Sequence, residues 1–409
     1  MTGEQTGAIT YALSLVAAGL IIQYWNQDAN IGIIIAVFWI TFTLVNCLPV
    51  GIYGELEMWL SSLKVITIVG FIVFGVCVAA GAGQEGVLGF KYWREPGAFN
   101  EYLVVGDAGR FVGFWAVLVQ ASVAFQGAEL VAVGAGEARD PRKTVPRAVC
   151  ITYWGVISLF VATIFVLTMT VPSDDPRLIG GGGGGSADAS ASPLVIAAHR
   201  AGVTALPDII NAVLLTAVLS AASSNVYSGS RVLVALAEDG LAPQMFRKTD
   251  RRGIPVRAVV ATAMLGLLGF LNLSAGGGKV FGWLLNVCAV AGLTTWASVC
   301  LSHLGFQRAL EAQGVARSEL PYRAPGQPYT AMYGLGFTVL VAVTQGFTVF
   351  INWNASDFFA AYISLILFGF LWGSHKFWCR LPRVDPATAD LASGRYDESE
   401  GWDTTRRGV

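Results

Sequence analysis

Residues 111–148 read FVGFWAVLVQASVAFQGAELVAVGAGEARDPRKTVPRA, and this stretch decides the fold class. It begins as an apolar run that is long enough to cross a bilayer, which takes roughly 20 residues of helix. The segment Phe125-Gln126-Gly127-Ala128-Glu129 interrupts this run, and a basic loop follows it with Arg139, Arg142, Lys143 and Arg147. A charged side chain inside hydrocarbon costs at least ~2.5–3.5 kcal/mol, so a membrane helix keeps a glutamate there only when something compensates.

Two interpretations of this interruption stand side by side. Transporters use such breaks because the start of a half-helix directs its positive dipole and free N–H groups at an anionic substrate. Under this interpretation Phe125, Gln126, Gly127 and Glu129 are candidate substrate-binding residues. The alternative is a kinked, inert span whose Glu129 faces a neighbouring helix or cytoplasmic water.

The composition predicts an all-α, polytopic helical membrane protein. Of the 409 residues 54% are hydrophobic and only 13% are charged, and the mean hydropathy is +0.59. A soluble protein has about a quarter of its residues charged. The runs are too long and too unbroken for a spanning β-barrel, which shows ~10-residue alternating segments. We expect ten membrane spans, over Ala8–Trp25, Ile31–Ile52, Met58–Ala80, Phe111–Gly134, Ala148–Val171, Ile209–Tyr227, Val256–Leu271, Val280–Leu304, Tyr333–Phe350 and Phe358–Phe377.

The positions of the basic residues predict the orientation. Of the 26 lysines and arginines, 19 lie in or beside the loops of one side and six on the other, and Lys64 lies within a span. By the positive-inside rule the richer side is cytoplasmic, so both termini are expected in the cytoplasm. Residues 1–378 form the predicted membrane domain, and residues 379–409 a cytoplasmic tail that we expect to be disordered because it mixes charge with Ser, Thr and Gly.

The sequence favours neither an enzyme nor a metalloprotein. The six cysteines lie in or beside spans, and the three histidines are far apart and match no metal spacing. Lys64 and Glu129 are the two Lys, Arg, Asp or Glu residues that we place well inside spans, and a separated pair supplies no catalytic constellation.

Lys64 lies about 9 Å along its helix from Met58. It is either a lysine that reaches the cytoplasmic headgroups or a buried amine that gains and loses a proton during a transport cycle. A third polar patch, with Ser220, Ser223, Ser224 and Asn225, lies in an otherwise apolar helix. Its side chains either bind ions or substrate, or join helices by hydrogen bonds.

Five blocks give the chain a specific resemblance to fungal amino acid permeases. In chain order they are IIQYW (21–25), GIYGELEMWLSSLKVI (51–66), GFKYWREPGAF (89–99), AGEARDPRKTVPRA (135–148), and the serine-rich span that runs into YSGSRVLVALAEDGLAP (227–243). The chain thus resembles members of the amino acid–polyamine–organocation (APC) superfamily along nearly its whole length.

This resemblance implies an inverted-repeat, leucine-transporter-like fold that binds an amino acid near the midplane between broken helices. It implies proton symport without a cofactor, with Lys64 in the place of a sodium site, and with the amino acid, protons and the bilayer as partners rather than nucleic acid. The expected location is the plasma membrane. An amino acid sensor or an inactive paralogue would share these motifs.

The same resemblance makes the chain begin within the family's third span, so we expect an N-terminally truncated transporter that is inactive by itself. Two positions depart from the family pattern. The family usually has a glutamate near Ser14, and an asparagine where this chain has Ser223. Asn225 lies two residues further on.

Overall fold

The computed structural model describes residues 2–128, 131, 141–178, 192–273, 277–320, 322–351, 353–379 and 384–391. Their regular structure is helical, without a strand in these ranges. The chain forms two compact units. The Lys64 unit comprises Gly7–Val117 and Tyr153–Leu285, and the Gln126 unit comprises Met1–Thr6, Leu118–Thr152 and Asn286–Val409.

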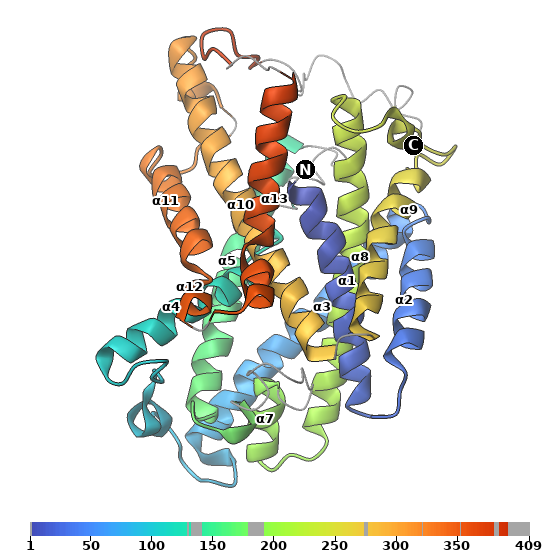
Figure 1. Cartoon of the computed structure of the whole chain (residues 1–409). Helices are drawn as coiled ribbons and strands as arrows, with labels where there is room; N and C mark the ends of the chain where they lie inside the picture. Colours follow the sequence, from blue (N-terminus) through green and yellow to red (C-terminus); the bar gives the residue numbers. More distant parts are fainter. Residues whose placement is uncertain are drawn as a thin grey trace. The chain divides into compact units, whose positions relative to one another are not determined.

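Figure 1 shows the helices in chain order. The α-helices are α1 (Thr2–Gln23), α2 (Ile31–Val45), α3 (Val50–Cys77), α4 (Asp107–Val123), α5 (Pro141–Thr170), α7 (Pro193–Arg200), α8 (Leu206–Glu238), α9 (Val256–Leu265), α10 (Gly277–Ala312), α11 (Tyr329–Thr344), α12 (Phe347–Ile351) and α13 (Ala355–Cys379). Shorter helical turns of other types are η1 (Val78–Ala82), η2 (Trp93–Gly97), η5 (Gln244–Arg247), η6 (Gly266–Leu273) and η7 (Arg317–Glu319).

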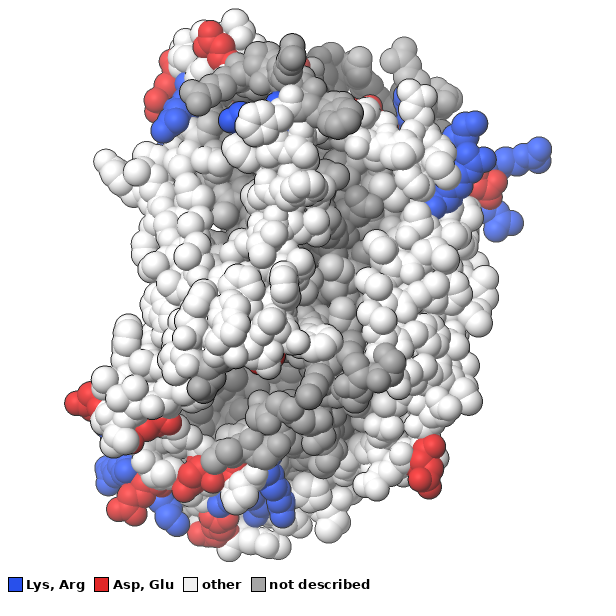
Figure 2. Space-filling view, viewed as in Figure 1, with Lys and Arg blue, Asp and Glu red and all other residues white. Residues whose placement is uncertain are grey.

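The predicted all-helical membrane class is confirmed. Among the described residues, seven helices are long and apolar enough to cross a membrane: Val50–Ala82, Lys143–Thr170, Leu206–Glu238, Val256–Leu273, Phe281–Ala312, Tyr329–Ile351 and Ala355–Phe377. Two shorter apolar helices cover Ile9–Gln23 and Ile31–Val45. On the face shown in Figure 2, most of the charged side chains lie toward the ends of the helices.

Two predicted boundaries were wrong at the same place. The run Ile31–Ile52 is not one span, because α2 ends at Val45 and a turn over residues 46–49 separates it from α3. Pro49 has no N–H to continue α2 and directly precedes the first turn of α3. The expected loop over Tyr53–Glu57 is therefore helical, and Glu57 belongs to the same helix as Lys64.

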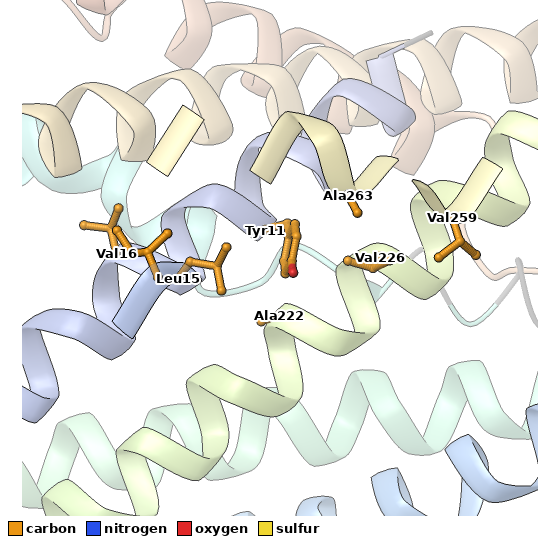
Figure 3. Packing of buried hydrophobic residues seen from close by; sticks show 8 residues of the cluster. Tyr11, Leu15, Val16, Ala222, Val226, Val259 and Ala263 are labelled. Carbon is orange, nitrogen blue, oxygen red and sulfur yellow. The ribbon is translucent and has the colours of Figure 1, made fainter. Parts of the chain in front are cut away.

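The core of the Lys64 unit is a cluster of fully buried side chains from α1, α2, α8 and α9 (Figure 3). Its members are Tyr11, Leu15, Val16, Ile35, Ala222, Val226, Val259 and Ala263. Helices in lipid gain little hydrophobic free energy from association, so close packing and interhelical hydrogen bonds hold such a cluster. Gly266 allows one such approach, since a Cβ there would lie 2.5 Å from Cδ1 of Tyr11. The Tyr11 hydroxyl donates to the Trp39 carbonyl at 3.2 Å, so its polar end is satisfied.

A short helix that the sequence did not predict, α7, packs in the same unit. Val195, Ile196, Ala197 and Ala198 are buried in a cluster with Phe71 of α3, Val171, which follows α5, and Ile210 of α8. Arg200 ends α7, and its guanidinium binds Glu85 at 2.7 Å, Asp175 at 3.0 Å and the Tyr92 hydroxyl at 2.8 Å. One arginine thus ties α7 to the segments that follow α3 and α5.

The Gln126 unit has its own core. Ala289 and Leu293 of α10 pack with Val341 and Ala342 of α11, and Leu118, Trp296 and Leu365 lie against them. Residues 384–391 follow α13 and the undescribed residues 380–383. The side-chain amide of Gln313 binds two carbonyls of this segment, those of Pro386 at 3.1 Å and Ala389 at 2.7 Å.

Candidate functional site

The inner face of α3 carries a polar stripe at helical spacing. Tyr53, Glu57, Lys64 and Thr67 are three, four or seven residues apart and are partly buried, whereas residues between them, such as Trp59 and Ile66, are exposed. Positions with these separations lie on one face of a helix. This face of α3 packs against α8 within the Lys64 unit.

Lys64, Ser220 and Glu57 form one hydrogen-bonded group across this interface. The Lys64 ammonium donates to Ser220 Oγ at 2.7 Å and lies 3.4 Å from Glu57 Oε1. The Ser220 hydroxyl in turn donates to Glu57 Oε1 at 2.5 Å. The two charged side chains are 26% and 25% exposed, which places them between a surface pair and a buried pair.

Helix geometry explains this arrangement. Seven residues span about 10.5 Å of helix, too far for neighbouring side chains, but each Cα–Cβ bond tilts toward the N-terminus. Lys64 can therefore reach back toward Glu57, with Ser220 of α8 between them. Within this unit the Lys64 side chain contacts α8, where its partner is Ser220 rather than Ser223, Ser224 or Asn225. A role of Lys64 in proton coupling stays a prediction.

The other predicted residues of α8 contact neighbouring helices. The side-chain amide of Asn46 donates to Ser223 Oγ at 3.2 Å, and the Tyr53 hydroxyl donates to Ser224 Oγ at 3.1 Å. Asn225 is buried. Ser223 and Ser224 thus make interhelical hydrogen bonds, and a role in substrate binding stays a prediction for all three residues.

An aromatic stack that the sequence analysis missed lies at the same interface. The rings of Tyr53 and Tyr227 are parallel within 6° with centroids 4.5 Å apart, and the Arg231 guanidinium lies 3.9 Å from the centroid of Tyr227. Cation–π contacts of this kind stabilise an interface by ~0.5–2 kcal/mol. The spacing of four residues between Tyr227 and Arg231 could have predicted the cation–π contact, but not the stack on Tyr53.

The break predicted in the fourth apolar run is present. The helix α4 ends at Val123, and residues 124–127 form a turn. The N–H groups of Ala124 and Phe125 bond to carbonyls three residues back, which tightens the helix end. Gly127 has φ +101°, a conformation that an L side chain adopts only at a cost of about 1–2 kcal/mol. Glu129 lies outside the described residues.

The side chain of Gln126 turns from this break toward α10 of the same unit. Its Nε2 donates to the carbonyl of Ala289 at 3.0 Å. Gly292 provides the space, because a Cβ at this position would lie 2.1 Å from both Cδ and Nε2 of Gln126. Phe125 is more than one-third exposed. The sequence analysis missed Gly292, since a glycine in an apolar helix carries no signal of its own.

The two predicted groups of site residues thus belong to different units. Lys64, Ser223, Ser224 and Asn225 lie in the Lys64 unit, and Phe125, Gln126 and Gly127 lie in the Gln126 unit. Within the Lys64 unit, Lys64 lies on α3 and the other three lie on α8, which packs against α3.

These features define a polytopic helical membrane protein. Several helices are long enough to span a membrane, and one of them, α3, carries the ionisable Lys64 on its packed face. A further apolar helix, α4, is broken. A profile described as "Amino acid permease" matches residues 2–386. The chain therefore belongs to the amino acid permease family.

Known relatives agree with this assignment. The chain is 42% identical to the basic amino-acid permease of Saccharomyces cerevisiae over 378 residues, which are 91% of this chain and 65% of that protein. It is 42% identical over 362 residues to the lysine-specific permease of the same yeast, covering 88% of this chain and 59% of the relative. The proline-specific permease of Emericella nidulans is 38% identical over 393 residues, 95% of this chain and 71% of the relative. The chain thus spans about three-fifths of the length of the two yeast relatives.

Proposed function

We propose that this protein carries amino acids across a membrane by alternating access, with proton symport through Lys64. The observation that carries the proposal is the family match over residues 2–386. The names of the relatives include basic, lysine-specific and proline-specific permeases, so amino acids are the substrate class that we propose.

The substrate site that we propose uses the break after α4. Residues 124–127 form a turn that ends the regular helix of α4. Irregular backbone at membrane depth is tolerated only beside protein or water, which is the setting of a binding cavity. Phe125, Gln126, Gly127 and Glu129 are the proposed substrate-binding residues of this segment, and Ser223, Ser224 and Asn225 are those that we propose on α8.

The coupling that we propose follows from the group around Lys64. In its protonated form the Lys64 ammonium donates to Ser220 and faces the Glu57 carboxylate, so it joins α8 to α3. Loss of the proton removes the positive charge and leaves Glu57 without its counter-charge. A conformation in which α3 and α8 separate would then become more favourable, and proton binding would shift the population between the two states.

Orientation is part of the proposal. The 19-to-6 partition of basic residues supports cytoplasmic termini, and the expected location is the plasma membrane. Reporter fusions at Gly184 and at the C-terminus should report opposite sides of the membrane. Reporters that mark the same compartment would contradict this topology.

The transport proposal is tested by uptake of labelled lysine, arginine, proline and glutamate in permease-deficient yeast. The cells express residues 1–409, or the same protein extended by any upstream coding sequence. Accumulation that collapses when the proton gradient is dissipated supports the proposal, and Lys64→Met should abolish its pH dependence. Binding without flux would identify a sensor instead, and neither binding nor flux in either form would contradict the proposal.

A further inference from the structure

The segment between η1 and α4 is unusually apolar on its surface for a loop outside the spans. Val87, Phe90, Phe99, Leu103, Val104 and Val105 are each about half or more exposed, and Val105 is 84% exposed. Large exposed apolar patches on a loop mark a surface that is covered by a partner or by lipid. This segment, residues 87–105, is called the apolar loop below.

The apolar loop is attached to the end of a membrane-spanning helix. The rings of Phe90 and Trp93 make edge-on contacts with Phe165 of α5, with centroids 6.1 and 5.5 Å apart. The indole N–H of Trp93 donates to Thr168 Oγ1 at 3.1 Å. The side-chain amide of Asn100 donates to the carbonyl of Ser173 at 2.7 Å, just beyond the last residue of α5. The loop is therefore held at the C-terminal end of α5.

The patch continues onto exposed apolar surfaces of neighbouring helices. Phe165 is itself 42% exposed, and Val161 and Ile164 beside it on α5 are more exposed still. At the other end of the loop, Phe99 contacts Phe114 of α4, which is 45% exposed. The apolar loop thus joins the exposed apolar surface of α5, which is long enough to span a membrane, to that of α4.

The backbone presents the most apolar part outward. Leu103 has φ +60°, a left-handed conformation that leucine adopts rarely, and the Tyr102 N–H donates to the Gly109 carbonyl at 3.2 Å. The fold thus keeps Val104 and Val105 exposed in a constrained turn directly before α4, where a polar turn would be expected in water.

We propose that residues 87–105 lie in the membrane–water interface at the C-terminal end of α5, with Leu103, Val104 and Val105 inserted at the boundary between headgroups and acyl chains. Trp93 and Tyr102 are residue types enriched at this depth. Lys91 and Arg94 are exposed on the same loop, and their long side chains can bury an apolar stem while the charge stays among the headgroups. Lipid fits this surface better than a second copy of the chain, because the patch is continuous with the exposed apolar surface of the membrane-length helix α5 and carries aromatic residues interleaved with charges.

The test uses an environment-sensitive fluorophore attached to a bioorthogonal residue, which leaves the six cysteines untouched. The label is placed at position 105, and at position 174 as a matched control, because Asp174 is exposed in the segment that follows α5. The full chain is reconstituted in liposomes of phosphatidylcholine with and without lipids that carry a shallow nitroxide quencher. Aqueous iodide quenching is measured on the same samples.

We expect the label at position 105 to emit at shorter wavelength, to be quenched several-fold more by the nitroxide lipids and less by iodide than the label at position 174. Equal behaviour at the two positions would overturn the proposal. Protection from both quenchers that grows with the protein-to-lipid ratio would overturn it in favour of a contact between copies. A second label at position 104 guards against a local effect of the probe, and it should follow position 105. None of these readouts depends on transport.

Discussion

Lys64 Nζ on α3 and Ser220 Oγ on α8 lie 2.7 Å apart, and both reach the same carboxylate oxygen of Glu57. The serine is thus donor to the glutamate and acceptor from the lysine, which makes it the bridge between two helices. Such an arrangement depends on the charge of the lysine, because a neutral amine would leave the carboxylate paired with a hydroxyl alone.

Replacing Lys64 by Met should lower the free energy of unfolding by about 1–3 kcal/mol. This range lies between the ~0–1 kcal/mol of an exposed pair and the ~3–5 kcal/mol of a buried charge that loses its partner, because both side chains are about a quarter exposed. Thermal unfolding of the purified protein in lipid nanodiscs measures this loss of stability. Lys248→Met, at an exposed lysine, is the control and should change little. The double variant Lys64→Met/Glu57→Gln should lose less free energy of unfolding than Lys64→Met alone. An equal or greater loss would show that the Glu57 carboxylate does not need the charge of Lys64.

Substitutions of Tyr53 compare how much the ring stack and the hydrogen bond contribute to stability at the other end of the α3–α8 interface. Tyr53→Phe removes the hydrogen bond to Ser224 but keeps the ring over Tyr227, so we expect a loss of only ~0.6 kcal/mol, typical of such bonds in membranes. Tyr53→Ala also removes the ring and should cost about 0.5–1.5 kcal/mol more, which is the contribution of an aromatic pair beyond its burial. Comparable losses in the two variants would mean that the stacked rings contribute little.

The sequence predicted features that depend on one helix better than those that depend on two. Apolar length placed the spans, and the glycine in Phe125-Gln126-Gly127 predicted the break, because helix formation and its interruption are local. The residues alone left two orientations of Lys64 open, and the resemblance to the permeases favoured the interior one. The partners of Lys64 were not predicted, because apolar length extends the second span through Pro49 and leaves Glu57 in a loop, whereas α3 begins at Val50 and contains Glu57. The packing of the Gln126 side chain against Gly292 depends on the contact between two segments that are far apart in the sequence. No pattern along either segment predicts this contact.

Substitution of Arg200, which lies outside the spans, should lower the stability of the protein strongly. Asp175, whose side chain is only 7% exposed, is one of its three partners. Arg200→Met would leave this carboxylate nearly buried without a counter-charge, at a cost of about 3 kcal/mol. Arg200→Lys should recover only part of this loss, because an ammonium cannot reach three partners with the geometry of a guanidinium. The exposed Arg177 provides the control, and Arg177→Met should leave the unfolding temperature unchanged. A similar shift in both arginine variants would attribute the effect to net charge alone.

The Tyr92 hydroxyl should make the stability that this cluster contributes depend on pH in the alkaline range. Burial and the hydrogen bond to Glu85 raise the pKa of Tyr92 above its ordinary value, although the neighbouring Arg200 opposes them. A pKa raised on folding contributes stability that is fully present below the unfolded value of about 10 and is lost as the pH rises through the folded value. The difference in unfolding temperature between the wild type and Tyr92→Phe should therefore be constant from neutral pH to about pH 9 and shrink above pH 10. A difference that is independent of pH up to pH 11 would show that the hydroxyl does not titrate in this way.

Gly292 should couple energetically to Gln126. In Gly292→Ala the new methyl would lie 2.1 Å from the Gln126 amide, so that side chain must leave its bond to the Ala289 carbonyl. Overpacking costs about 1–3 kcal/mol, and the better helix propensity of alanine returns about 1 kcal/mol of it. Gly282 on the same helix is the matched control, because nothing lies within 4 Å of a Cβ there and only the propensity gain should appear. In the double variant Gln126→Ala/Gly292→Ala the clash is gone, so its stability should exceed the sum of the two single effects by about 1–2 kcal/mol. If the two substitutions are additive in thermal unfolding, Gln126 does not occupy the space that Gly292 leaves.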